Sequence, residues 1–90
     1  MQKYLLEFLG SFTLIYVFLT TRNPIAIGVT LAFLMMFLES NTGFNPVFIF
    51  AKVYTGEMSS KKVIPYCLAE ILGGLTAVQI FHYVNIMENS

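Results

Sequence analysis

Two features of the sequence have residue types and spacing that could act on a solute. Asn45-Pro46 precedes a short apolar segment, and two carboxylates, Glu7 and Glu70, interrupt longer ones. Asparagine is a strong helix N-cap, and proline fits the first helical position because its missing N–H would have no partner there. The pair predicts a helix over 46–54 whose free N–H groups and positive dipole end lie at Asn45. Such an end repels cations and favours an acceptor such as a water or hydroxyl oxygen.

The two carboxylates share a local pattern, Glu-x-Leu-Gly, at 7–10 and 70–73. Ionisable residues inside membrane segments are costly and usually functional. We predict that Glu7 and Glu70 brace the loop before Asn45 by hydrogen bonds. The alternative is a direct part in transport.

Other chemistry has little support in the sequence. It contains no Ser/His/Asp set, metal-ligand spacing or phosphate-binding loop, so we expect neither an enzyme nor a cofactor or metal. The formal net charge of zero argues against nucleic acid as a partner. Cys67 is the single cysteine, which excludes an internal disulfide, and His82 is interpreted as an interfacial anchor because no second histidine exists to pair with it.

The elements that position these residues are apolar segments. The 90 residues are 57% hydrophobic and 11% charged, whereas about 25% of residues are charged in soluble proteins. A soluble domain this small has too little interior for so much apolar surface, so we expect a lipid bilayer as the solvent. A cleaved signal peptide is not expected, because Glu7 interrupts the first apolar run and no small-x-small site follows.

Four apolar segments are predicted to be helical, and they are 4–20, 24–38, 46–54 and 63–87. A crossing needs about 20 helical residues, and the nine of segment 46–54 would span only about 13 Å. The expected fold is therefore an all-α membrane protein, a single domain over 1–90 with three transmembrane helices and one re-entrant half-helix. A half-crossing survives only against protein or a water-filled cavity.

The basic residues predict an orientation for this multi-pass integral membrane protein. If segment 46–54 re-enters, Arg22 lies alone on one side of the membrane and four lysines lie on the other. They are Lys3, Lys52, Lys61 and Lys62. The positive-inside rule then places the N-terminus in the cytoplasm and the C-terminus outside.

Three stretches of sequence resemble one known family. Glu7–Phe12 is similar to "EFLGTF", Gly43–Val47 to "GHFNPA", and Lys61–Gly74 to "AKxVxPYxxAQxxGG". These motifs belong to the first half of the major intrinsic proteins, the aquaporins and glycerol facilitators. From Asn45 to Gly74 the spacing matches without a gap, and the resemblance covers nearly the whole chain.

The resemblance implies half of the aquaporin fold and a role for each matched residue. Asn45 would line the pore and Pro46 would cap the half-helix, with Gly43, Phe44 and Val47 completing the signature. Glu7 would be the buried carboxylate that accepts hydrogen bonds from the re-entrant loop. The residues that would allow close helix contact are Gly10, Gly73 and Gly74.

The chain departs from the family at several positions. Val47 replaces alanine, Glu70 replaces glutamine, and the loop before Asn45 is shorter and lacks a histidine. Phe48 stands where the family's second half carries its selectivity arginine. The shortened loop lets either Ile27 or Phe33 align with a filter position, so the choice between water and glycerol stays open.

The predicted function is a channel subunit for passive passage of water or a small neutral solute such as glycerol. Inverted repeats complete such pores, so the subunit needs a second half, either an antiparallel copy or a different chain. The lysine bias argues against the antiparallel copy. One alternative is a non-conducting, truncated channel-like protein that binds full-length relatives, and another is a proton-linked carrier that uses Glu7 and Glu70.

Overall fold

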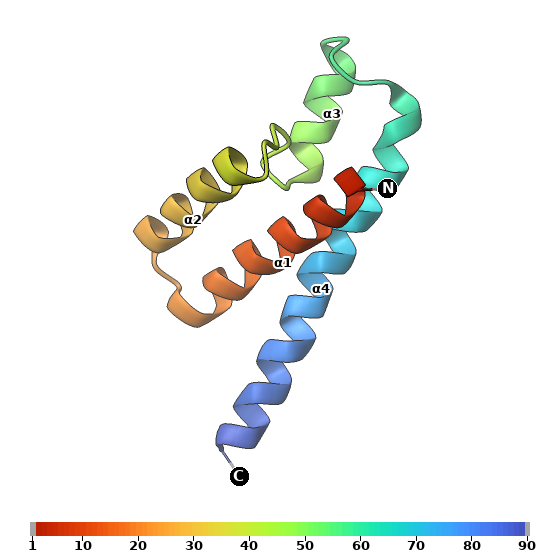
Figure 1. Ribbon diagram of the computed structural model, residues 1–90. Helices are drawn as coiled ribbons and strands as arrows, with labels where there is room; N and C mark the ends of the chain where they lie inside the picture. The colour runs from red at the N-terminus through yellow and green to blue at the C-terminus, as the bar shows by residue number, and fades with distance from the viewer. Residues whose placement is uncertain (1, 90) are drawn as a thin grey trace.

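The computed structural model describes residues 2–89, and every regular element in that range is helical (Figure 1). The elements are α1 (Gln2–Thr21), α2 (Pro24–Phe37), α3 (Pro46–Tyr54), the 3₁₀ turn η1 (Ser60–Lys62) and α4 (Val63–Glu88). The prediction of an all-α chain is confirmed, and each predicted helical segment begins and ends within two residues of the observed helix. The short turn η1 was not predicted.

The same N-terminal cap begins two of the helices. The Asn23 side chain accepts hydrogen bonds from the backbone N–H groups of Ile25 at 2.8 Å and Ala26 at 3.1 Å. The Asn45 side chain accepts one from Val47 at 2.9 Å. In both places the next residue is proline at the first helical position. The Asn-Pro dipeptide therefore defines where α2 and α3 begin.

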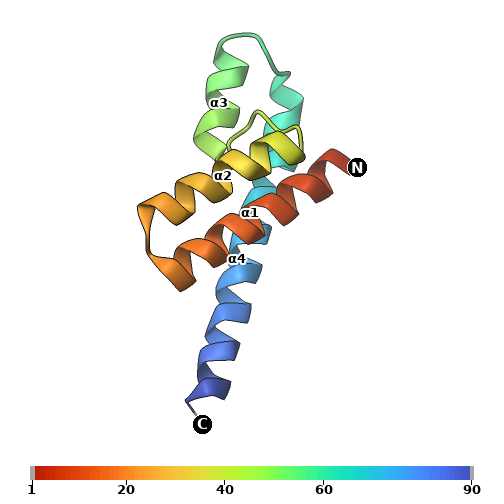
Figure 2. The ribbon, with the colours of Figure 1, turned by 60° about the vertical axis from the view of Figure 1, so that its left-hand side comes forward.

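Helices α1 and α4 form the central pair; they point in the same general direction and cross at an angle (Figures 1 and 2). Two aromatic contacts give the register. The rings of Tyr4 and Tyr66 meet edge-on with centroids 5.0 Å apart, and those of Tyr16 and Phe81 meet edge-on at 6.3 Å. The N-terminal halves of the two helices therefore lie at the same level.

The other two helices lie on different members of this pair. Helix α2 packs on α1, to which a tight turn connects it, and α3 packs on the first turns of α4. Helices α3 and α4 run in opposite directions and are connected through η1. Figure 2 shows α3 beside the beginning of α4. The loop 38–45 joins α2 to α3 and crosses the first turns of α1.

The chain is apolar on its outside. Among residues 2–89 only four hydrophobic side chains are buried: Phe44, Ile49, Tyr66 and Ala77. Large apolar side chains are exposed along every α-helix, including Phe37 at 74% and Ile64 at 69%. Lipid rather than water suits such a surface.

Two helical stretches are long and apolar enough to cross a membrane, judged by length and composition: Gln2–Thr21 and Ser60–Glu88. Only 17% and 28% of their most apolar windows are buried within the chain, which distinguishes them from the mostly buried core helix of a soluble protein. Helix α2 is apolar but has 14 residues, fewer than a crossing normally needs.

Of the two glycines in α4, Gly73 lies closer to α1. A Cβ atom added there would collide with the carbonyl oxygen of Phe8 and lie 3.2 Å from the backbone nitrogen of Phe12. Backbone atoms cannot rotate away, so we expect Gly73→Ala to lower the free energy of unfolding by about 1–3 kcal/mol. A thiol-reactive dye that reports exposure of Cys67 during heating in detergent measures the change.

Gly74→Ala is the matched control for this substitution. Its added Cβ would lie 3.5 Å from the Cγ1 atom of Ile15, an ordinary contact distance. We expect its unfolding midpoint to equal or exceed that of the unmodified protein, since alanine favours helix over glycine. Equal losses in the two variants would contradict a specific close approach at Gly73.

Candidate functional site

The loop before α3 contains unusual backbone conformations. Gly43 and Phe44 are consecutive residues with positive φ angles of 62° and 54°, and Glu39 at the start of the loop has φ 51°. Glycine adopts this region readily, whereas a bulky residue such as phenylalanine does so at a cost. The surrounding packing must therefore hold Phe44 in place.

The Phe44 side chain anchors the loop on α1. It is 5% exposed, and its ring occupies the space above Gly10. A Cβ atom at Gly10 would collide with the ring. The sequence predicted that Gly10 allows close contact with another helix; instead it receives an aromatic ring from the loop, because α1 meets the loop rather than a helix at this face.

Glu7 holds the same loop through hydrogen bonds. Its side chain is 3% exposed, and its two oxygens accept from the hydroxyl of Ser40 at 2.7 Å and from the hydroxyl of Thr42 at 2.5 Å. The Thr42 oxygen in turn accepts from the backbone N–H of Phe44 at 3.2 Å. Glu7 is therefore connected, through one hydroxyl, to the strained residue that precedes Asn45.

Glu70 lies beside this network but makes none of its hydrogen bonds. Its carboxyl is 2% exposed and faces Glu7 and Thr42, yet neither carboxyl oxygen has a hydrogen-bond partner in the described residues. The predicted hydrogen bonds from the loop to Glu70 are not formed, because the Thr42 hydroxyl donates to Glu7 instead. The backbone carbonyl of Glu70 accepts a hydrogen bond from the Ser11 hydroxyl at 2.7 Å.

The N-terminus of α3 opens onto a groove of about 520 Å³. Its walls are mostly apolar and come from α1, α2 and α4. They include Leu14, Ile15, Leu31, Ile71, Leu75 and Val78. Asn45 and Pro46 line the same groove. Asn45 is exposed and uses its side-chain oxygen for the cap, which leaves its amide N–H₂ with no hydrogen-bond partner in the described residues.

The remaining signature residues surround this position. Gly43 is buried, and its φ of 62° makes it the turn residue of the signature. Phe48, which is 47% exposed, lines the groove, whereas Val47 is 69% exposed and is not part of its lining. Gly74 lines the groove from α4.

A second recess of about 400 Å³ lies at the N-terminal end of α1. Its lining is polar and includes Glu7, Ser40, Thr42 and Tyr66. The loop borders both hollows, with residues 38–42 facing the polar recess and 43–45 facing the apolar groove. Glu7 lines the polar recess, whereas Glu70 lines the apolar groove.

Sequence reasoning missed the loop residues that contact the carboxylates. Glu7 accepts two hydrogen bonds from hydroxyl groups, and these belong to Ser40 and Thr42. The sequence did contain a signal for this contact. Two hydroxyl-bearing residues lie two positions apart in a loop that was expected beside a buried carboxylate. Residues 2–89 hold no group of three or more His, Cys, Asp or Glu side chains that could bind a metal ion.

Comparison with protein-family models, curated proteins and solved structures gives no match to this chain. The arrangement itself is a helical bundle with an apolar exterior and a short, capped helix whose N-terminus lines an open, mostly apolar groove.

Proposed function

We propose that this chain is a half-channel subunit that passes water or a small neutral solute such as glycerol. In this proposal α1, α2 and α4 cross the membrane and α3 is the re-entrant half-helix, as in the first half of a major intrinsic protein. The observation that carries the proposal is the exposed amide of Asn45, at the N-terminus of a nine-residue helix, in the wall of the groove.

The position of the groove along the two long helices supports this proposal. Its lining residues on α1, Ser11 to Ile15, lie near the middle of the helix Gln2–Thr21. Its lining residues on α4, Glu70 to Val78, lie in the central part of Val63–Glu88. If both helices cross the bilayer, the N-terminus of α3 is close to the membrane centre.

The proposed mechanism is passive. The Asn45 amide N–H₂ donates hydrogen bonds to passing water or hydroxyl oxygens. The first backbone N–H groups of α3, those of Val47 and Phe48, are already bonded to Asn45 and serve the solute only through the helix dipole. The positive end of the α3 dipole disfavours protons and other cations at the same level. The walls of the groove are mostly apolar, with Ser11 and Glu70 as their polar residues, and the Ser11 hydroxyl already donates to the Glu70 backbone carbonyl.

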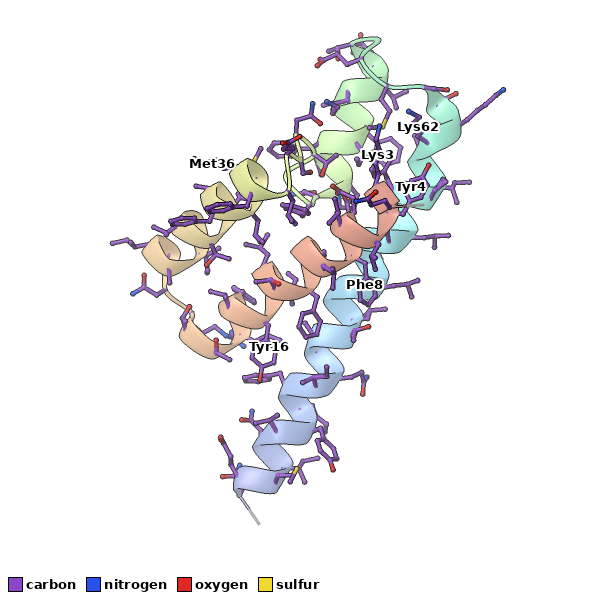
Figure 3. All side chains as sticks on the ribbon, in the orientation of Figure 1. Lys3, Tyr4, Phe8, Tyr16, Met36 and Lys62 are labelled. Carbon is purple, nitrogen blue, oxygen red and sulfur yellow. The ribbon has the colours of Figure 1, made fainter. Side chains whose placement is uncertain are left out.

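The positions of the basic residues support the proposed orientation. Lys52 lies in the last turn of α3, Lys61 and Lys62 lie in η1, and Lys3 is in the first turn of α1. These elements meet at one end of the molecule, where Figure 3 labels Lys3 and Lys62. Arg22 follows the opposite end of α1. The lysine-bearing end would face the cytoplasm.

A single chain leaves the groove open, so the proposal includes a partner half. Inverted repeats that meet at the midplane complete pores of this kind. The partner would be a different chain of opposite orientation or an antiparallel copy, and the lysine bias favours the different chain.

Osmotic swelling of reconstituted vesicles, with crosslinking to report stoichiometry, tests the proposal. Asn45→Asp keeps the capping oxygen but replaces the amide donor with a negative charge. We expect it to reduce protein-dependent water or glycerol flux at least about tenfold, equivalent to about 1.4 kcal/mol in the barrier. Asn23→Asp makes the same change at the other Asn-Pro cap and should leave the flux unchanged.

Other outcomes would contradict the channel. Equal flux through the Asn45→Asp and Asn23→Asp variants would show that Asn45 does not line the path of the solute. An effect seen only on a co-expressed full-length relative would favour the non-conducting partner, and proton movement abolished by Glu70→Gln would favour the proton-linked carrier.

A further inference from the structure

Glu70 raises a question that the proposed channel leaves unanswered. Its side chain is 2% exposed, and both of its oxygens lack a hydrogen-bond partner in the described residues. A buried carboxylate without donors is among the costliest arrangements in a protein. Native structures rarely keep such a group unless a bound species compensates it.

The side chains around Glu70 do not supply that compensation. The side chains nearest in interaction with the Glu70 carboxyl are those of Glu7 and Thr42. Thr42 donates its hydroxyl proton to Glu7, and the Ser11 hydroxyl donates to the Glu70 backbone carbonyl. Tyr66 and Cys67 of α4 also interact with Glu70, and Tyr4 of α1 interacts with Tyr66. None of these groups is basic.

We propose that Glu7 and Glu70, with the hydroxyl oxygens of Ser40 and Thr42, form a binding site for a small monovalent cation such as sodium. Hard cations prefer carboxylate and hydroxyl oxygens. A cation can contact both Glu70 oxygens and a neighbouring hydroxyl at once, whereas one proton would engage a single oxygen. A singly charged ion balances one of the two buried carboxylates, so the other carboxyl is neutral in the proposed site.

The polar recess gives this site a route of entry. It has a volume of about 400 Å³ and is lined by Glu7, Ser40 and Thr42. Lys3 and Glu39 both line it, so their opposite charges offset each other at its rim. A cation entering here would reach the Glu7 side of the site, whereas Glu70 lines the other hollow together with Asn45.

A bound cation would stabilise the loop as well as the carboxyls. Thr42 contacts Glu7 and accepts from the backbone of Phe44, so an ion held by the pair would fix the segment that leads into α3. This role does not depend on conduction, because it follows from the buried carboxyls alone.

The test compares thermal unfolding of the full chain in detergent with sodium, potassium or choline chloride at equal ionic strength. Exposure of Cys67 to a thiol-reactive dye reports unfolding. We expect about 0.3 M sodium chloride to raise the midpoint by at least about 4 °C over choline chloride. Glu70→Gln removes one carboxylate with little change in shape, and it should abolish the sodium-dependent rise.

Two further measurements keep the proposal falsifiable if Glu70→Gln fails to fold. Radioactive sodium should bind the unmodified protein at about one ion per chain, with unlabelled sodium competing and choline not competing. Glu57→Gln alters an exposed carboxyl and should keep the full sodium response. Equal midpoints in sodium and choline, or no bound sodium, would overturn the proposal and leave a proton as the compensating species. Neither readout depends on vesicle swelling, so this site and the channel can fail separately.

Discussion

Replacement of Glu7 by alanine is expected to free the loop before α3 and to lower the free energy of unfolding by about 3–5 kcal/mol. The carboxyl is 3% exposed and accepts from both Ser40 and Thr42. Each hydrogen bond to a charged group contributes about 1.5–3 kcal/mol. The substitution removes both bonds and leaves two polar hydroxyls beside a cavity.

The measurement is the heating midpoint in detergent, reported by Cys67, together with limited proteolysis of the loop. Glu39→Ala is the matched control, because it removes an exposed carboxyl from the same loop. The control should change the midpoint little and leave the loop resistant. If the two variants proved equally stable, Glu7 would not be the residue that holds the loop.

The loss of Glu7 should also reach the start of α3. Thr42 connects the carboxyl to the backbone N–H of Phe44, the residue immediately before the Asn45 cap. A loop released from Glu7 has no other buried hydrogen-bonded anchor on α1 among the described residues. In the proposed channel, the donors at the α3 N-terminus would then lose their fixed position.

The sequence predicted the helices well because their signals are local. Runs of apolar residues and the Asn45-Pro46 pair indicated where helices begin, and the Asn45 cap forms as expected. The matching cap at Asn23 was not predicted. The lengths of the segments separated the short α3 from the long α1 and α4. Glu7 was identified from its position inside an apolar run, which requires a partner for the charge.

Contacts between distant segments were harder to predict. The sequence placed Glu7 and Glu70 together at the loop, but the hydroxyl groups of the loop donate to Glu7 alone. Which carboxylate receives a hydroxyl depends on the exact path of the loop. That path depends on the positive φ angles at Gly43 and Phe44, which the sequence signals only at the glycine.

Gly10 illustrates the same difficulty. A glycine in a membrane helix suggests contact with another helix, and Gly73 does face the backbone of α1. Gly10 instead accommodates the Phe44 ring. The residue types are the same, so only the course of the loop distinguishes the two roles.

The pairing of Gly10 with Phe44 predicts a change of sign in a double-mutant cycle. Phe44→Ala removes a ring that is 5% exposed and should cost about 3–5 kcal/mol. Gly10→Ala should cost about 1–3 kcal/mol in the unmodified protein, because its Cβ collides with that ring. With the ring removed the collision disappears, and alanine in a helix is favoured over glycine by about 1 kcal/mol.

Gly10→Ala should therefore destabilise the unmodified protein and stabilise the Phe44→Ala variant. Unfolding midpoints of the four proteins, followed through Cys67, measure the coupling. Phe50→Ala provides the matched background, since Phe50 lies on α3 and is 58% exposed; Gly10→Ala should remain destabilising there. Additive effects at Gly10 and Phe44 would mean that the ring does not rest on α1. The strained backbone at Phe44 would then need another source of stability.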